Sequence, residues 1–237
     1  SPTVFYASLH AMQFWDGRAK DVEEQAGGPI LNPVEHNLAS EADVVARIEN
    51  EELYIDWFRR AFPEEDKPIN FANLTKAIGA FERTLNPVSR FDSYLDGDKN
   101  ALNKQEKKGL SSFMSSGCTT CHNGVALGGQ IFQKFGLYTD YWNLTKSKEI
   151  DNGLADLTNK DSDKHFFKVP SLRNIENTAP YFHDGSVALL EEAIKHMGKA
   201  QTNIDLTDEQ VGDIQAFLSS LTADIPKDVQ KSPFEDE

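Results

Sequence analysis

The stretch Ser116-Gly-Cys-Thr-Thr-Cys-His-Asn-Gly124 constrains this chain more than any other, because it holds both cysteines of the 237 residues. Two residues separate Cys118 from Cys121, and His122 follows directly. Thiols at this spacing can add across the two vinyl groups of a haem, and the adjacent imidazole can then bind the iron. The motif therefore predicts one covalently attached haem c, with Cys118 and Cys121 as thioether residues and His122 as proximal ligand.

Three other uses of such a cysteine pair compete with this interpretation. A structural zinc site needs four ligands, but the sequence has no second cysteine pair and no H-x-x-x-H motif. A thioredoxin-like redox pair would follow a strand of a βαβ unit, whereas we expect a helix before Cys118. A disulfide across two intervening residues would be strained. The sequence favours covalent haem over all three.

The rest of the chain predicts helices joined by long irregular segments. Ser40-Glu-Ala-Asp43 resembles a capping box and opens one or two helices, and Asn70 precedes an apolar stripe with a 3.6-residue period. Asn103-Lys-Gln-Glu106 opens a helix that leads into Cys118, and Thr207-Asp-Glu-Gln210 opens a last long helix. Strand signals are nearly absent. We therefore predict a mainly α fold with cytochrome c-like helical haem domains and long loops.

Glycine-rich and polar segments interrupt the helical pattern. We expect breaks at Ala26-Gly-Gly-Pro29 and at residues 124 to 136, and a long surface loop over residues 139 to 170. Leu95-Asp-Gly-Asp98 is the expected joint between two parts. The predicted division is 1–95, 96–225 for a C-terminal electron-transfer cytochrome c domain, and 226–237 for a flexible tail.

Charge and hydropathy exclude some classes of partner. With 24 basic and 38 acidic residues the formal charge is −14, which argues against binding to duplex nucleic acid. Solubility accounts for most of such a charge, and steering of a cationic protein partner is the lesser alternative. No apolar run is long enough for a membrane span. The chain opens on Ser1-Pro-Thr-Val, inside an apolar segment, so we expect it to be a piece of a longer polypeptide.

Haem c needs a sixth iron ligand or an open position, and the sequence offers several candidates. Met197, which follows His122 by 75 residues, is the best thioether candidate. His196 is its adjacent rival, and His183 is a third possibility. Met114 is expected to point into the core, and Met12 lies far upstream. From the residues alone, the choice between Met197 and His196 stays open.

Four segments resemble the bacterial di-haem cytochrome c peroxidases in the same order and over nearly the whole chain. They are "QFWDGRAKDVEEQAGGPILNPVEHN" (13–37), "SGCTTCHNGVALGGQIFQKFG" (116–136), "FKVPSLRNIENTAPYFHDGSV" (167–187) and "HMGKAQ" (196–201). Related haem enzymes that modify methylamine dehydrogenase have tyrosine where Met197 falls. The methionine therefore favours the peroxidase branch.

The resemblance implies a role for five residues around the haems. Cys118, Cys121 and His122 would hold the high-potential, electron-accepting haem, with Met197 as its axial ligand. Trp15 matches the tryptophan that lies between the two haems, where it would assist electron passage.

The resemblance also implies catalytic and calcium residues. Gln25 and Glu35 match the polar pair over the peroxide-binding haem, where Glu35 would act as acid and base while Gln25 positions peroxide or water. Thr178 and Pro180 match backbone carbonyl ligands of a Ca²⁺ ion between the haems. Our own inference adds Arg173 as a partner of a haem propionate.

Members of this family carry two haem motifs, and the first precedes the segment with which this chain begins. The resemblance thus implies one haem c here and two in the parent protein. Residues 1–95 would be the remainder of the N-terminal peroxidatic domain and the interdomain region. In this family, reduction of one haem releases a ligand from the other and rearranges loops. The resemblance therefore implies that Gly27-Gly28 is a flexible element of this switch.

The implied function is that of a periplasmic cytochrome-c peroxidase, usually a homodimer. It would reduce hydrogen peroxide to water with electrons from a small cytochrome c or cupredoxin, and this chain would carry the electron-transfer haem. By itself the chain should not turn over peroxide, because an iron with His and Met ligands has no open site. The alternative is a mono-haem c-type electron carrier without catalysis, which would not need Glu35.

Overall fold

The computed structural model describes residues 2–230. The helices are α1 (Val22–Leu31), α2 (Glu41–Ile48), α3 (Glu52–Ala61), α4 (Phe71–Glu82), α5 (Arg90–Leu95), α6 (Lys104–Ser115), α7 (Tyr141–Thr145), α8 (Leu154–Thr158), α9 (Leu190–Met197) and α10 (Asp208–Ser219). Strands β1 (Phe132–Lys134) and β2 (Phe166–Lys168) pair antiparallel, with Gln133 opposite Phe167. The mainly α fold class is confirmed. Of the predicted 226–237 tail, residues 231–237 lie outside the described residues.

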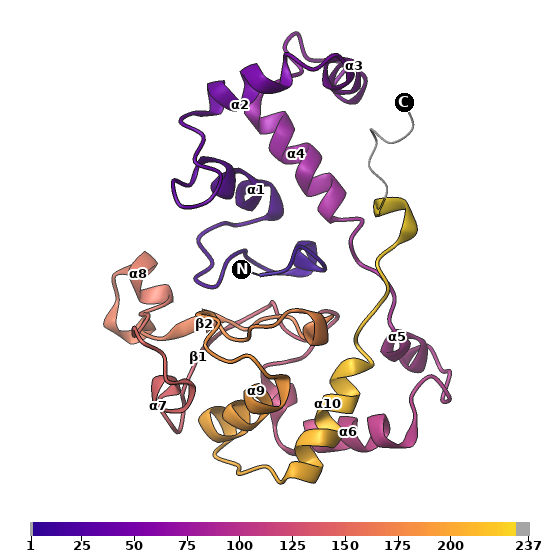
Figure 1. Cartoon of the computed structure of the whole chain (residues 1–237), viewed down its shortest axis with the longest axis vertical. Coiled ribbons are helices and arrows are strands. Elements are labelled where there is room, and N and C mark those ends of the chain that lie inside the picture. Colours follow the sequence, from indigo (N-terminus) through magenta and orange to yellow (C-terminus); the bar gives the residue numbers. More distant parts are fainter. Residues whose placement is uncertain (1, 231–237) are drawn as a thin grey trace.

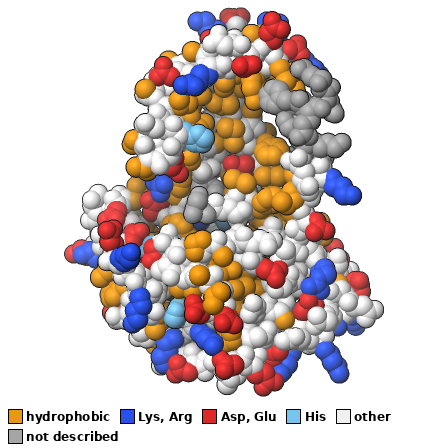
Figure 2. All heavy atoms as spheres, in the orientation of Figure 1, with side chains coloured by type: hydrophobic (Ala, Val, Ile, Leu, Met, Phe, Trp, Pro, Cys, Tyr) orange, Lys and Arg blue, Asp and Glu red, His pale blue; other side chains and the backbone are white. Residues whose placement is uncertain are grey.

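The elements form two bodies with the first part of the chain between them (Figure 1). One body holds α1 to α4, and the other holds α5 to α10 together with β1 and β2. Apolar side chains gather over the α1–α4 body on one face of the molecule (Figure 2). Val34 and Phe81 in this body are 87% and 50% exposed. Across residues 2–230, no helix combines the length and apolar character that a bilayer span requires.

Side-chain caps define the predicted helix starts. The Asn70 side chain accepts a hydrogen bond from the amide of Asn73 at 2.8 Å, at the beginning of α4. Reciprocal capping boxes open α6, between Asn103 and Glu106, and α10, beginning at Thr207. Each cap satisfies amide groups that the first turn of a helix leaves unpaired. The expected starts are confirmed, and the segment after Ser40 contains two helices, α2 and α3.

The break predicted at Ala26-Gly-Gly-Pro29 is wrong, because α1 continues through it to Leu31. Asp21 caps the helix by accepting a hydrogen bond from the amide of Glu24 at 2.9 Å. Gly27 faces α4 so closely that a Cβ added there would lie 3.0 Å from the ring of Phe71. Packing against α4 thus outweighs the weak helix propensity of the two glycines.

Residues 139–170 are not the simple surface loop that their polar composition predicts. They contain α7, α8 and β2, and Tyr141 is fully buried. Its ring stacks on Phe135 with centroids 4.8 Å apart, and Phe167 is also buried. A few aromatic residues supply enough apolar area to anchor a segment whose other residues are polar.

The largest hydrophobic core lies in the α5–α10 body. Its buried residues are Phe91, Leu102, Phe113, Leu127, Leu172, Ile194, Val211, Ile214, Phe217, Leu218 and Leu221. Helices α6 and α10 cross closely at Gly109, because glycine has no side chain. A Cβ at this position would collide with the carbonyl oxygen of Asp213. The amide of Phe91 donates to the carbonyl of Ser220 at 3.2 Å. Helix α5 therefore packs with the C-terminal body, although the predicted division at residue 95 assigns it to the first part. The division itself stays a prediction.

Candidate functional site

The cysteine motif begins where α6 ends. Gly117 takes a left-handed conformation, with φ +81°, that favours glycine, and a 3₁₀ turn follows over Cys118–Thr120. Both cysteines are free and half-buried. Burial raises the pKa of Cys118 to about 11, and the nearby Cys121 contributes in the same direction. The two thiols are thus unpaired and presented three positions apart.

The imidazole of His122 is held by the loop that follows it. Its Nδ1 lies 3.2 Å from the carbonyl oxygen of Leu127, and its ring lies 6.4 Å from that of Phe113. Burial lowers the pKa of His122, although hydrogen bonding to the backbone carbonyls of Leu127 and Pro170 opposes this effect. In the neutral tautomer that donates Nδ1–H to Leu127, Nε2 carries a free lone pair. Two free thiols and one neutral imidazole with an available nitrogen fit a covalent haem.

Met197 is the last residue of α9 and is followed by a π-helical turn, Gly198–Thr202. Turns of this kind are frequent at functional sites. Met197 packs against an apolar cluster, which we call the aromatic cluster. Its buried members are Phe135, Tyr141, Phe167 and Ala200, with Trp15, Trp142, Leu144 and Phe182 packed on them.

The rival ligands occupy different environments. His196 is half-buried 6.5 Å from the ring of Phe182, and burial lowers its pKa. The side chain of His183 is 4% exposed and stacks on Phe167 at 4.2 Å. Met114 is 57% exposed on α6, so the expectation that it points into the core is wrong; its position on the helix turns it toward solvent. Met12 is 39% exposed. Met197 as axial ligand stays a prediction.

Trp15 lies in the aromatic cluster with Met197. Its ring approaches His183 edge-on at 6.3 Å, and its carbonyl oxygen accepts a hydrogen bond from the amide of Lys168 at 2.8 Å. The structure thus brings together two predicted site residues, Trp15 and Met197, that lie 182 positions apart in the sequence.

A pair beside Trp15, formed by buried Lys168 and half-buried His10, was not predicted from the sequence. Lys168 is 4% exposed, and its Nζ lies 2.9 Å from the carbonyl oxygen of Met12 and 3.0 Å from Nδ1 of His10. Burial lowers the pKa of Lys168 to about 8. Burial and the charge of Lys168 lower that of His10 to about 4. The sequence signal that could have indicated a buried lysine was its position between two apolar residues, Phe167 and Val169.

The predicted catalytic pair lies on and after α1. Gln25 is half-buried within the helix, and Glu35 is exposed in the turn that follows it. A pocket of about 300 Å³ opens beside Glu35, lined by Phe14, Arg18, Ala19, Glu24, Gly28, Asn32 and Glu35. The Arg18 guanidinium covers the ring of Phe14 at 3.5 Å. Gln25 is not among the lining residues, so the structure does not bring the predicted pair into one pocket.

Of the two predicted calcium residues, Pro180 follows a cis peptide bond with Ala179, and Thr178 directly precedes Ala179. The hydroxyl of Thr178 donates to the carbonyl of Ile175 at 3.1 Å. Within residues 2–230, no three His, Cys, Asp or Glu side chains form a group that could hold a metal ion. That finding concerns side chains, whereas the predicted calcium ligands are backbone carbonyl oxygens. The calcium site therefore stays a prediction.

Arg173 uses its guanidinium within the protein. It forms two hydrogen bonds of 2.7 Å with the carboxylate of Asp92, one of 3.0 Å with Ser89, and two of 3.0 and 2.9 Å with the carbonyl of Val125. These contacts engage every nitrogen of the guanidinium. The predicted bond to a haem propionate has not been tested, but it would have to compete with these partners.

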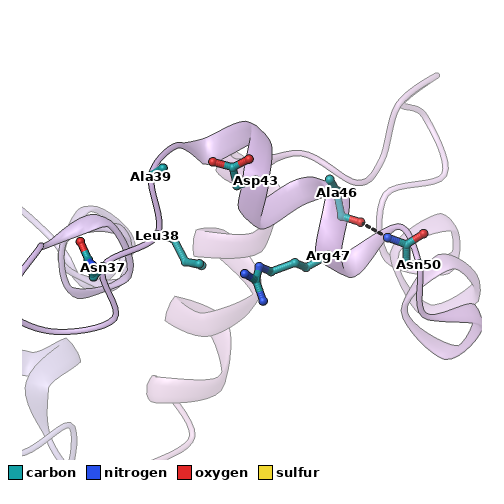
Figure 3. Close-up of a pocket in the computed structure, with 7 residues that line it drawn as sticks. All are labelled: Asn37, Leu38, Ala39, Asp43, Ala46, Arg47 and Asn50. Atoms are coloured by element: carbon teal, nitrogen blue, oxygen red, sulfur yellow. Dashed lines mark hydrogen bonds between the residues drawn. The ribbon is translucent and has the colours of Figure 1, made fainter.

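A second pocket, of about 490 Å³, lies along α2 and the turn before it (Figure 3). It is lined by Asn37, Leu38, Ala39, Asp43, Ala46, Arg47 and Asn50, and Asn50 donates to the carbonyl of Ala46 at 2.7 Å. It contains none of the predicted site residues. We assign it no role.

Comparison with known proteins gives consistent matches. The model of the di-haem cytochrome c peroxidase family matches residues 1–100. The chain is 45% identical to the cytochrome c551 peroxidase of Nitrosomonas europaea and 46% identical to that of Pseudomonas aeruginosa. These alignments cover 95% and 96% of this chain but 66% and 65% of the relatives, so the chain spans slightly less than two thirds of their length.

Two further matches cover more of the related chain. The methylamine utilization protein MauG of Methylophilus methylotrophus is 31% identical, over 93% of this chain and 67% of the relative. The solved structure of a MauG-like protein associated with microbial copper homeostasis superposes with a TM-score of 0.83 at 32% identity. That superposition covers 98% of this chain and 77% of the other.

Proposed function

This chain belongs to the di-haem cytochrome c peroxidase family, and we propose that its whole protein reduces hydrogen peroxide to water. The balanced reaction takes one peroxide, two protons and two electrons to two waters. The electrons would come from a small cytochrome c or cupredoxin. The observation that carries the proposal is the pairing of free Cys118 and Cys121 with a His122 ring oriented by Leu127.

Four residues would hold the haem of this chain. Cys118 and Cys121 would form its thioether bonds, and His122 and Met197 would bind its iron. A haem c with these ligands supplies a one-electron Fe(III)/Fe(II) couple of raised potential. Neutral His122 and the apolar surroundings of Met197 both suit that role. Thr178 and Pro180 would offer carbonyl oxygens to a Ca²⁺ ion.

Trp15 would assist electron passage between the haems of the whole protein. Its membership of the aromatic cluster with Met197 supports this role. The hydrogen bond from the Lys168 amide to the Trp15 carbonyl fixes the backbone that carries the indole.

Glu35 would move the proton that peroxide cleavage requires. Its carboxylate would accept a proton from one peroxide oxygen and donate it to the other as the O–O bond breaks. Two further protons and the two electrons supplied through the haems would complete the reduction to two waters. Exposure beside the 300 Å³ pocket leaves the carboxylate accessible to a small substrate. Gln25 would position peroxide or water, although this requires a rearrangement that brings it to the same pocket.

We place the protein in the periplasm, because attachment of haem to a C-x-x-C-H motif takes place outside the cytoplasm. A homodimer is the expected assembly.

The test is the turnover of the full-length protein with Glu35→Gln. We expect peroxide turnover to fall by about 10²- to 10⁴-fold, the usual contribution of a general acid and base, with unchanged haem content. Glu24→Gln is the matched control, because Glu24 lines the same pocket but accepts a hydrogen bond from the amide of Lys20 at 2.8 Å. Turnover that survives Glu35→Gln would remove the acid and base assignment. A wild-type protein with one haem and no turnover would identify a mono-haem electron carrier instead.

A further inference from the structure

The loop after the cysteine motif, residues 123–129, is fixed by its carbonyl oxygens; we call it the anchor loop. Three successive carbonyls each accept a side-chain hydrogen bond. Val125 accepts from Arg173 at 3.0 and 2.9 Å, Ala126 from the hydroxyl of Ser171 at 2.7 Å, and Leu127 from Nδ1 of His122 at 3.2 Å. The anchor loop therefore joins His122 to two residues of the segment 169–173.

The same segment also holds the far end of the anchor loop. The amide of Gly129 donates to the carbonyl of Val169 at 2.7 Å. Gly128, with φ +138°, lies so close to the carbonyl of Pro170 that a side chain would collide with it. Both ends of the carbonyl series are thus fixed against one strand-like segment, which leaves the loop little freedom to shift.

The segment is in turn anchored in the core of the C-terminal body. Arg173 is 4% exposed and pairs with Asp92 at the beginning of α5, where Ser89 and Asp92 form a capping box. Burial would raise the pKa of Asp92, but hydrogen bonds from Arg173 and Ser89 outweigh it and hold this pKa below its usual value. A charged pair of this kind has a fixed, two-pronged geometry.

We propose that Arg173 and Ser171 are positioning residues for His122, because they hold the Leu127 carbonyl where it accepts the Nδ1–H of the imidazole. This rests on the proposed function in one respect, which is the attachment of haem c at Cys118 and Cys121. Arg173 then acts on the iron through the anchor loop and not through a propionate.

The physical consequence is a change in the electron donation of His122. A fixed acceptor at Nδ1 keeps the ring in one tautomer and makes Nε2 a stronger donor. A stronger donor stabilises Fe(III) relative to Fe(II) and lowers the reduction potential. Loosening the anchor loop should therefore raise the potential of this haem and expose the Nδ1 proton to exchange with solvent.

The experiment compares two substitutions with two matched controls in the full-length holoprotein. Ser171→Ala removes the bond to Ala126, and Arg173→Lys keeps the charge opposite Asp92 but loses the fork that reaches Val125. Ser115→Ala removes a similar hydroxyl bond, of 3.2 Å to Ser112, on the adjacent α6. Arg90→Lys alters another arginine that pairs with a carboxylate, Glu106, in the same body.

Two quantities are measured, the midpoint potential of the haem by redox titration and the exchange of the His122 Nδ1 proton by NMR of the reduced protein. We expect Ser171→Ala and Arg173→Lys to raise the potential and to speed exchange at least tenfold, while both controls leave the two readouts unchanged. A tenfold change in the Fe(III)/Fe(II) ratio at a fixed applied potential corresponds to 59 mV for one electron.

An unchanged potential and exchange rate in a folded Ser171→Ala protein would overturn the proposal, as would equal shifts in the controls. If Arg173→Lys fails to fold, Ser171→Ala alone decides. If the denatured wild-type protein retains no haem, the proposed function fails separately. Exchange of the His122 proton, measured in the haem-free protein, then still tests whether Ser171 and Arg173 position the ring.

Discussion

The two ends of the candidate site are held in different ways. His122 is fixed by the anchor loop, which is tied through Arg173 to the core of the α5–α10 body. Glu35 lies in an exposed turn after α1, where its amide bonds to the nearby carbonyl of Asn32 at 3.0 Å. Contacts from distant parts of the chain therefore hold the end that we propose binds haem, whereas Glu35, at the proposed peroxide end, is held by a local turn. Substitutions should damage structure and cofactor at one end and turnover alone at the other.

The largest effect should come from removing the thioether residues. The double substitution Cys118→Ala with Cys121→Ala should abolish covalent haem at this motif, because no thiol remains to add to a vinyl group. The mass of the denatured full-length protein measures this loss directly. Glu35→Gln should retain the full haem complement. Haem lost in both proteins would erase the proposed contrast between the two ends.

The next effect concerns stability in acid. His10 has a pKa of about 4 in the folded protein against an ordinary value of 6.5, because of burial first and the charge of Lys168 second. Between these values the unfolded chain binds a proton that the folded protein does not, so stability falls as the pH falls from 6.5 to 4. The full shift corresponds to about 3 kcal/mol.

His10→Gln should remove this slope while keeping a group that can accept from Lys168. His36→Gln is the control on the loosely held side, because His36 is exposed beside Glu35. Urea unfolding between pH 4 and 7 measures the difference. An equal loss of slope in both variants would show that burial of His10 is not its cause.

A smaller effect separates the two candidate axial ligands at the tightly held end. Met197→His should lower the midpoint potential of the haem, because two imidazole ligands favour Fe(III) more than one imidazole with a thioether does. His196→Gln, at the adjacent position, should leave the potential unchanged. The opposite pattern in a redox titration would make His196 the ligand.

The smallest effect belongs to the two glycines of α1, near the loosely held end. A Cβ at Gly28 would meet Phe14 at an ordinary 3.5 Å, so Gly28→Ala should stabilise the protein by about 0.4–1 kcal/mol. Gly27→Ala must displace the ring of Phe71 and should gain less. Thermal unfolding tests both. If Gly28→Ala also slows the activation of peroxide turnover that follows addition of a reductant to the full-length protein, the predicted flexibility of Gly27-Gly28 gains support.

The sequence predicted what depends on local patterns. The caps at Asn70, Asn103 and Thr207 lie three residues or fewer from their partners, so a short window contains their whole physical cause. The Cys118–His122 motif is local in the same sense. The helix through Gly27 and the burial of Tyr141 depend on partners far along the chain, and no local pattern contains them.

The same reason explains what sequence reasoning missed in the site. Lys168 meets His10 across 158 residues, and Arg173 meets Asp92 across 81. The sequence analysis gave Lys168 no role and expected Arg173 to bind a haem propionate. The fold buries both side chains and pairs them within the protein, and these partners are visible only in the three-dimensional arrangement.

The bond between Phe91 and Ser220 has a consequence for how such chains can be assembled. It places the beginning of α5 beside the end of α10, so the first and last helices of the α5–α10 body meet. Helices α6 and α10 also cross closely at Gly109. A module whose ends meet can be inserted into, or appended to, another polypeptide without stretching its own framework. The two ends of the α5–α10 body thus meet at one place, where a neighbouring polypeptide segment could join both of them.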